Sequence, residues 1–374
     1  MPRALITLLL CIALVGTNGM ILSPVLTDIA GQFGVSVPVA GRAIAAYGLG
    51  TMFTALWLGR SLDSFGVKRA LRYAIIVAGF CEVGSAFSQG WVMLVAFQFV
   101  AGMGAGIALP AIYTITGAIS PEGRESRYMA RVLLGWSVSL VVAVPLGAAL
   151  SDFVGWRIML VIGGSLCLAL VPFVLTLPPI TLPARTTPKM ARFKPLFLPG
   201  GAALYAICLL FMICFYGIYA YIGDHARQAF SLGSTAAGLI ALVYGVGFGL
   251  ASFFAPLIDK LGQQTALRLG LAFAATVLAC MSFPKAFASL LLLVFLWGWV
   301  NHLVLNIIVV GLNALAPANR GAVMGLYSGT AYLGAAVGAV LMGLFYEQYG
   351  FIGPTISAAI FLLFALLLTP VKRP

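Results

Sequence analysis

The stretch GRSLDSFGVKR at positions 59–69 lies between two long apolar runs, and a shorter copy of it, DKLG, lies at positions 259–262. The two copies are 196 residues apart, so Asp63 corresponds to Asp259 and Gly66 to Gly262. Further pairs repeat at the same offset: Asp28 with Asp224, Gly102 with Gly298, Pro121 with Pro317, Arg124 with Arg320 and Gly147 with Gly343. Chance explains shared glycines in a chain with 43 of them, but it does not explain shared Asp, Pro and Arg residues. The sequence therefore indicates a duplicated half.

The composition indicates that both copies lie in a membrane. Of the 374 residues, 62% are hydrophobic and only 8% are charged, and the mean hydropathy is +1.09. A soluble domain cannot hide that much apolar surface from water. One membrane-spanning helix takes roughly 20 apolar residues, so the chain has room for about twelve spans joined by short connections. We expect an all-α integral membrane protein with twelve transmembrane helices in two pseudo-symmetric six-helix bundles.

Apolar runs between charged and helix-breaking clusters predict where the spans lie. The predicted spans are 4–27, 38–58, 71–88, 92–118, 129–151, 157–178, 200–222, 234–256, 266–283, 287–314, 322–345 and 352–369. The first run is interpreted as a retained helix and not as a signal peptide, because it is long and many similar runs follow it. The polar, proline-containing segment 179–199 is predicted to be a cytoplasmic linker between an N-terminal bundle, 1–178, and a C-terminal bundle, 200–374.

The distribution of basic residues predicts the orientation. With both termini in the cytoplasm, all but four of the 21 Lys and Arg residues lie on the cytoplasmic side; the exceptions are Arg42, Arg157, Arg227 and Lys285. This is the asymmetry that the positive-inside rule requires of a multi-pass inner-membrane protein. Six spans per half give both halves the same orientation, so that rocking one half on the other can open a central cavity to either side.

Several of these segments carry a resemblance to a known family. The loop at 59–69 resembles the signature loop of the major facilitator superfamily, and VPLGAALSDFVGWR at 144–157 looks like the antiporter motif of its drug:proton and arabinose-efflux-type branch. PVLTDIA at 24–30 and QFVAGMGAG at 98–106 are similar to two further landmarks of that branch. The resemblance implies a proton-coupled exporter. Two positions depart from the family pattern, because Ser64 and Gln98 stand where a basic residue is usual.

Residues with a gating or conformational role are expected in these motifs. Glycines let a loop turn tightly and approach a neighbouring helix, an Asp can bind the positive N-terminal end of a helix, and a proline can kink a span. The alternative for the loops is a plain cytoplasmic turn, and for the fifth span it is ordinary Gly/Pro packing. The gating candidates are Gly59, Asp63, Gly66, Lys68, Arg69, Arg124, Pro145, Gly147, Asp259 and Gly262.

Three ionisable residues are candidates for proton coupling, because a charge inside a span is costly and usually functional. Glu82 lies in the third predicted span, where a carboxyl group withdrawn from water could load and release a proton. Asp28 lies at the predicted outer end of the first span and could instead have a structural or outer-gate role. His302 lies in the tenth span, where an interhelical hydrogen bond is the alternative.

Polar and aromatic residues within spans are candidates for the substrate cavity. His302 and Asn306 are four residues apart and therefore share a helix face. The aromatic residues could line a pocket for flat or amphipathic molecules, or they could be packing residues and interfacial anchors. The cavity candidates are Asn18, Tyr47, Gln98, Tyr113, Tyr216, Tyr219, Asn301 and Asn306.

Other classes of protein are disfavoured by the sequence. It contains no arrangement typical of a nucleophilic enzyme, a phosphate loop or a metal site, and its basic clusters do not form a nucleic-acid-binding stripe. We expect no cofactor, no metal and no enzymatic activity. We expect a monomeric transporter that exports a small molecule, such as a drug, a sugar or a nucleoside, in exchange for protons. A proton-coupled importer or uncoupled facilitator, and a non-transporting receptor or scaffold, are the alternatives.

Overall fold

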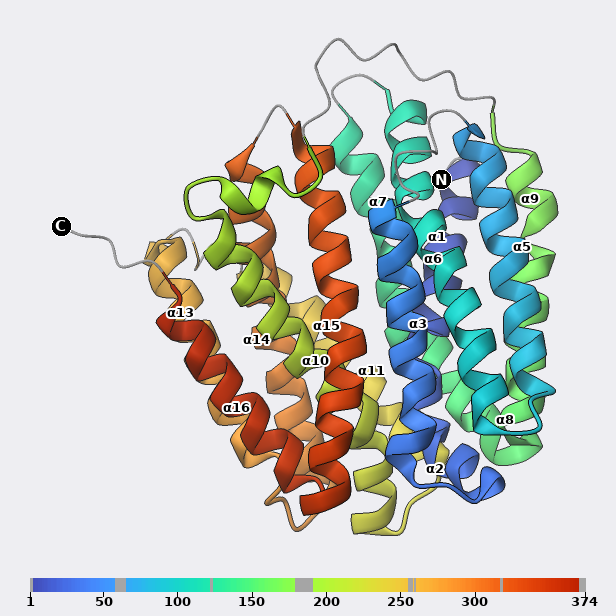
Figure 1. The fold of residues 1–374 in the computed structure, drawn as a ribbon, viewed down its shortest axis with the longest axis vertical. Helices are drawn as coiled ribbons and strands as arrows, with labels where there is room; N and C mark the ends of the chain where they lie inside the picture. Colours follow the sequence, from blue (N-terminus) through green and yellow to red (C-terminus); the bar gives the residue numbers. More distant parts are fainter. Residues whose placement is uncertain are drawn as a thin grey trace.

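The computed structural model describes residues 3–57, 65–121, 124–178, 191–254, 258, 260–316 and 319–369. The described chain is helical throughout, and its long helices run roughly side by side (Figure 1). Eight described helical segments are long and apolar enough to cross a membrane, and α16 is a shorter apolar helix. This finding agrees with the expected all-α membrane protein. We refer to the described residues up to 178 as the N-terminal half and to those from 200 onward as the C-terminal half.

The N-terminal half begins with a broken helix. Its elements are α1 (Arg3–Asn18), α2 (Leu22–Phe33), α3 (Val37–Trp57), α5 (Val67–Ala86), α6 (Trp91–Ile119), α7 (Glu125–Val138), the π-helical η1 (Ser139–Ala143), α8 (Val144–Ala169) and α9 (Val171–Leu175). The first predicted span ended at residue 27, and that end was wrong, because helix α2 continues to Phe33. The break between α1 and α2 lies three residues before Pro24, which lacks the backbone donor that a continuous helix would need.

The fifth and sixth predicted spans meet at one residue. Gly155 has φ +83°, a left-handed value that L side chains rarely adopt, and it interrupts α8 at the position where the sequence predicted a connection between residues 151 and 157. The segment Arg127–Leu175, which is apolar throughout its spanning window, is therefore two helical passes joined at Gly155.

The C-terminal half repeats this plan. The short η2 (Lys194–Phe197) precedes it, and its elements are α10 (Gly201–Phe230), α11 (Ser234–Leu250), η3 (Ala251–Phe254), α13 (Gln263–Cys280), α14 (Phe287–Leu315), α15 (Arg320–Tyr349) and α16 (Ile352–Leu367). The seventh predicted span, 200–222, ended too early, because α10 continues to Phe230. The other long helices lie within a few residues of predicted spans. The tenth predicted span, for example, was 287–314.

The internal repeat reappears as matching helix crossings. A Cβ atom at Gly102 on α6 would lie 2.1 Å from the carbonyl oxygen of Tyr47 on α3. In the other half, a Cβ atom at Gly298 on α14 would lie 2.2 Å from the carbonyl oxygen of Tyr244 on α11. Only glycine allows either pair of backbones to approach so closely. The same close crossing thus occurs twice, about 196 residues apart in the sequence.

Candidate functional site

The two halves meet along three pairs of helices. Helix α3 packs against α15, α2 packs against α10, and the η1–α8 segment packs against α11. Glycines make the last two contacts close, because a Cβ atom at Gly238 on α11 would lie 2.7 Å from the Ala148 side chain and one at Gly223 on α10 would lie 3.1 Å from the Ser23 carbonyl oxygen. The sequence predicts a cavity between the halves, so polar groups on this surface are candidates for a functional role.

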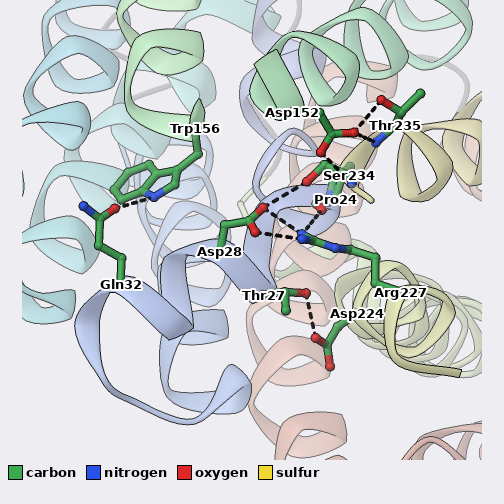
Figure 2. A network of polar contacts seen from close by, with 10 residues as sticks. All are labelled: Pro24, Thr27, Asp28, Gln32, Asp152, Trp156, Asp224, Arg227, Ser234 and Thr235. Atoms are coloured by element: carbon green, nitrogen blue, oxygen red, sulfur yellow. Dashed lines mark hydrogen bonds and ion pairs between the residues drawn. The ribbon is translucent and has the colours of Figure 1, made fainter. Parts of the chain in front are cut away.

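An ion pair joins the halves at one end of this interface (Figure 2). The guanidinium of Arg227, near the end of α10, binds both carboxylate oxygens of Asp28 on α2, each at 2.7 Å. The Ser234 hydroxyl donates a further hydrogen bond to Asp28 over 2.9 Å. Two parallel N–H···O bonds to one carboxylate are the strongest geometry that an arginine can offer.

A second carboxylate from the N-terminal half caps a helix of the C-terminal half. Asp152 on α8 accepts bonds from the backbone N–H groups of Ser234 (2.9 Å) and Thr235 (2.7 Å) and from the Thr235 hydroxyl (2.6 Å). Those N–H groups belong to the first turn of α11, where they have no partner within the helix and where the helix dipole favours a negative charge. The N-terminus of α11 is therefore capped across the interface (Figure 2).

A third carboxylate is fully buried nearby. Asp224 on α10 has no exposed surface and accepts hydrogen bonds from Thr27 of the other half (2.7 Å), from Gln228 (2.8 Å) and from the Tyr346 hydroxyl (2.5 Å). One turn earlier on α2, the Ser23 hydroxyl donates to the backbone oxygen of Tyr219 over 2.5 Å.

We refer to these residues together as the closure network: Ser23, Thr27, Asp28, Asp152, Asp224, Arg227, Ser234 and Thr235. In the described part of the chain, every hydrogen bond between the two halves involves the closure network, and all of them lie at the same end of the interface. Among the described residues, the polar bonds between the halves therefore lie at one end of the interface.

A small pocket lies between the halves next to the break between α1 and α2. Four aromatic side chains line it, from α3, α7, α10 and α15: Tyr47, Trp136, Tyr216 and Tyr332. The other lining residues are small or aliphatic and come from α1, from the α1–α2 break, from α3 and from α15: Val15, Gly16, Gly19, Met20, Ile44, Gly48 and Ala335. The pocket contains two of the predicted cavity residues, Tyr47 and Tyr216.

Glu82 lies inside the N-terminal half, with 1% of its surface exposed. Its carboxyl accepts a hydrogen bond from the Gln98 amide over 3.3 Å, and the same amide donates to Ser85 over 3.0 Å. The Gln98 carbonyl oxygen is buried and has no partner among the described residues. Glu82 is close enough to Tyr47 in the pocket for direct electrostatic interaction. Gln98, predicted to line the cavity, thus contacts Glu82 and does not line the pocket.

The remaining cavity candidates are scattered. Asn18 is buried beside the sulfur of Cys167 at 3.8 Å, and Asn301 donates to the Tyr244 hydroxyl over 3.1 Å. Tyr113 is partly buried against the N-terminal core, and Asn306 is exposed on α14.

Two further candidates have unsatisfied polar atoms. The ring of His302 packs edge-on against Phe248 with centroids 4.7 Å apart, and its buried Nδ1 has no described partner. The hydroxyl of Tyr219 is buried and also has no described partner.

The gating candidates of the first loop are only partly described. Gly59 and Asp63, and Asp259 of the second copy, lie outside the described residues. Gly66 and Gly262 both have left-handed φ values, +90° and +78°, directly before a helix, so the two copies share this local turn.

Two basic residues of the first loop contact the helices beside it. Lys68 donates to the backbone oxygens of Leu175, over 2.7 Å, and Leu177, and therefore caps the end of α9. The Arg69 guanidinium lies 5.8 Å from the centre of the Phe65 ring. The Arg124 side chain is exposed.

Pro145 and Gly147 lie where the expected antiporter motif crosses the interface. Pro145 follows the π-helical turn η1 and contacts α11, since its Cα lies 3.2 Å from the Cβ position of Gly238. A Cβ atom at Gly147 would lie 2.6 Å from the end of the Ile21 side chain, at the α1–α2 break. Pro145 thus belongs to the surface between the halves, whereas the contacts of Gly147 lie within the N-terminal half; the alternative of ordinary packing is still open for both.

Sequence reasoning missed several members of the site: Asp152, Arg227, Ser234, Thr235, Trp136 and Tyr332. Arg227 could have been found, because it is one of only four basic residues predicted on the side opposite to the basic loops, and such an exception needs a local partner. Ser234 and Thr235 act partly through backbone N–H groups, which carry no signal in the sequence. Within the described residues, no group of three or more His, Cys, Asp or Glu side chains could hold a metal ion.

Comparisons with known proteins agree on one family. The family model described as Major Facilitator Superfamily matches residues 8–298 and 207–374. The uncharacterized MFS-type transporter YwfA of Bacillus subtilis (strain 168) is 27% identical over 346 residues, which cover 90% of this chain and 84% of that protein. A probable sugar efflux transporter of Pasteurella multocida (strain Pm70) is 24% identical over 367 residues, covering 92% and 85%.

A solved structure has the same fold. A bacterial homolog to the human lysosomal transporter Spinster, in an inward-facing and unoccupied conformation, superposes with a TM-score of 0.83 over 99% of this chain and 96% of that one. The sequence identity is 13%, so the similarity concerns the fold.

Proposed function

Because this chain belongs to the Major Facilitator Superfamily and is a membrane transporter, not an enzyme, we propose that it exports a small molecule across the inner membrane by alternating access, in exchange for protons. The proposal includes twelve spans in two six-helix bundles, 1–178 and 200–374, joined by the linker 179–199, with both termini in the cytoplasm. The transporter acts as a monomer, and its partners are the substrate, protons and the lipid bilayer.

The observation that carries alternating access is the confinement of the closure network to one end of the interface. A carrier that alternates must close one end while the other opens, and a set of bonds restricted to one end can break without unfolding either half. The closure network contains Arg227, one of the four basic residues predicted to lie on the side opposite to the basic loops. We assign it to the outer side, so that the present arrangement is closed to the outside.

Proton coupling is assigned to Glu82. A carboxyl group enclosed in the N-terminal half, bonded only to a neutral amide, can exist with or without a proton, and each form changes the charge next to Tyr47 and the pocket. Asp28 fits an outer-gate role better, since Arg227 holds it in the closed arrangement. His302 packs against Phe248, has no charged partner among the described residues and does not line the pocket.

The proposed function is tested by imposing a proton gradient on inverted membrane vesicles and following it with a pH-sensitive dye. Neutral aromatic compounds, cationic drugs, sugars and nucleosides are added one at a time. Export by antiport predicts that one class dissipates the gradient, and that vesicles without the protein do not respond. If the protein moves the solute at the same rate with and without the proton gradient, transport is not coupled to protons.

A second candidate function within transport is a proton-coupled importer or an uncoupled facilitator. It is favoured by Gln98, which stands where the resembling motif has an arginine and which is the hydrogen-bond partner of Glu82. Accumulation of the solute inside energised cells that contain the protein would identify an importer, whereas equilibration in both directions would identify a facilitator.

A further inference from the structure

The pocket between the halves is lined by four aromatic side chains. Tyr47, Trp136, Tyr216 and Tyr332 come from four different helices, two from each half. The rings of Tyr216 on α10 and Tyr332 on α15 lie side by side, with centroids 6.4 Å apart and planes tilted by 34°. Aromatic faces from both halves therefore converge on one small space, next to the α1–α2 break.

None of the eleven lining residues carries a formal charge: they are tyrosine, tryptophan, aliphatic residues, methionine and glycine. A cation or a carboxylate in this space would lose its water without gaining a partner among the lining side chains, at a cost of several kcal/mol or more. Glu82 interacts electrostatically with Tyr47, but it is not part of the lining and is bonded to Gln98. The lining thus favours an uncharged ligand.

The pocket also offers very few polar groups. The Tyr47 hydroxyl already donates to the backbone oxygen of Val15 over 3.0 Å. The hydroxyls of Tyr216 and Tyr332 make no hydrogen bond to any described residue, although Tyr332 is buried and Tyr216 is partly buried. A ligand can therefore form one or two hydrogen bonds here, and the rest of its surface meets apolar or aromatic groups.

From these observations we infer that this space, once the halves move apart and widen it, binds a neutral, planar aromatic molecule that carries one or two polar substituents, and that Tyr216 and Tyr332 select it through their free hydroxyls. The inference rests on the proposed transport function and names its substrate class. A sugar is also neutral, but it brings many hydroxyls, and most of them would be buried here without a partner.

The inference can be tested by isothermal titration calorimetry on the purified full-length protein in detergent. The probes share one ring system and differ in charge: 2-naphthol is neutral, 2-naphthoate is an anion and 2-naphthylmethylammonium is a cation. Glucose is the fourth probe. We expect 2-naphthol to bind at least 10-fold more tightly than the two charged probes and glucose to give no heat of binding.

Variants connect the binding to the pocket. Tyr216→Phe and Tyr332→Phe keep the rings and remove the hydroxyls, so each is expected to weaken 2-naphthol binding about 2- to 10-fold, as the loss of one neutral hydrogen bond predicts. Tyr349→Phe, at a tyrosine that is 57% exposed, is the matched control and should bind as the unmodified protein does.

Three results would each overturn the inference. The first is that 2-naphthol does not bind. The second is that a charged probe or glucose binds as tightly as 2-naphthol. The third is that 2-naphthol binding is unchanged in the double variant Tyr216→Phe, Tyr332→Phe. The proposed function fails in a different way. If 2-naphthol binds and responds to the variants but no solute crosses reconstituted liposomes, the site is right and transport is wrong.

Discussion

Arg227 brings one positive charge to a surface that carries three carboxylates. It binds Asp28 directly and also interacts electrostatically with Asp152 and Asp224. Asp152 is satisfied by the first turn of α11, and Asp224 by neutral donors, one of which belongs to the other half. Because all three negative charges depend on groups across the interface or on Arg227, this arginine determines whether the closed end is electrostatically balanced.

Replacing Arg227 should therefore open this end of the protein. Arg227→Gln leaves Asp28 beside Asp152 and Asp224 without a cation, which we expect to weaken the closed arrangement by about 1–3 kcal/mol, allowing for the partial exposure of Asp28. The measurement is the distance between spin labels at Gly31→Cys and Ala229→Cys in a background free of other cysteines. Both positions are exposed and near the closure network.

The control for that experiment is Arg42→Gln, which removes an arginine that lies over the Trp91 ring and bonds to no member of the closure network. A broader and longer distance distribution in Arg227→Gln, but not in Arg42→Gln, is expected. Identical distributions in both variants would mean that the ion pair does not hold the end closed.

Replacing Glu82 should abolish proton coupling without preventing folding. Glu82→Gln keeps the shape of the side chain and its contact with Gln98 but cannot exchange a proton. We expect substrate-dependent proton movement to disappear while the protein is still inserted and monodisperse. Dye-monitored proton flux in vesicles is the measurement, and Glu347→Gln, at an exposed glutamate, is the control. Normal flux in Glu82→Gln would remove Glu82 from the mechanism.

At the scale of elements, close helix crossings hold each half together as a unit. Gly102 and Gly298 make the same crossing in the two halves, and a methyl group at either position would collide with a carbonyl oxygen about 2 Å away. A half that moves as one body needs such tightly packed helices, because loosely packed helices would deform instead of transmitting the motion.

Alanine at these two positions should therefore destabilise the protein. We expect Gly102→Ala and Gly298→Ala each to lower the free energy of unfolding by about 1–3 kcal/mol, the usual cost of overpacking. Gly163→Ala on α8 is the matched control, since a Cβ atom there meets nothing within 4 Å. Thermal unfolding in detergent is the measurement. If all three variants unfold at the same temperature, the two close crossings accommodate an added methyl group at little cost in stability.

At the scale of the whole molecule, the orientation in the membrane decides which end the closure network shuts. We predict that Gly90→Cys, between α5 and α6, reacts with a membrane-impermeant maleimide added to intact cells, whereas Ala191→Cys, in the linker, reacts only when the cells are opened. A Cβ atom at Gly90 meets nothing within 4 Å, so the label has room. The reverse pattern would place the closure network on the cytoplasmic side and make the present arrangement open to the outside.

The sequence by itself determined the family, the positions of the helices and the internal repeat. Apolar runs predict spans because lipid requires a continuous apolar stretch and backbone groups satisfied within the helix. The predicted boundary between the fifth and sixth spans includes Gly155, where the helix does turn, because glycine is the residue that adopts this backbone conformation cheaply. Tyr47 and Tyr216, two of the predicted cavity residues, line the pocket, and Glu82 is buried in the N-terminal half; their roles in transport stay predictions.

Only the tertiary structure decided which of these residues meet. Asp28 and Arg227 are far apart in the sequence, and a pattern along one helix does not tell which helix of the other half it will face. The cap that Asp152 provides uses backbone N–H groups of α11, which every sequence has and none reveals. Tyr332 belongs to the pocket because α15 packs against α3. The sequence determines which segments form helices and which residues they carry. The packing of the two halves determines which of those residues form a site between them.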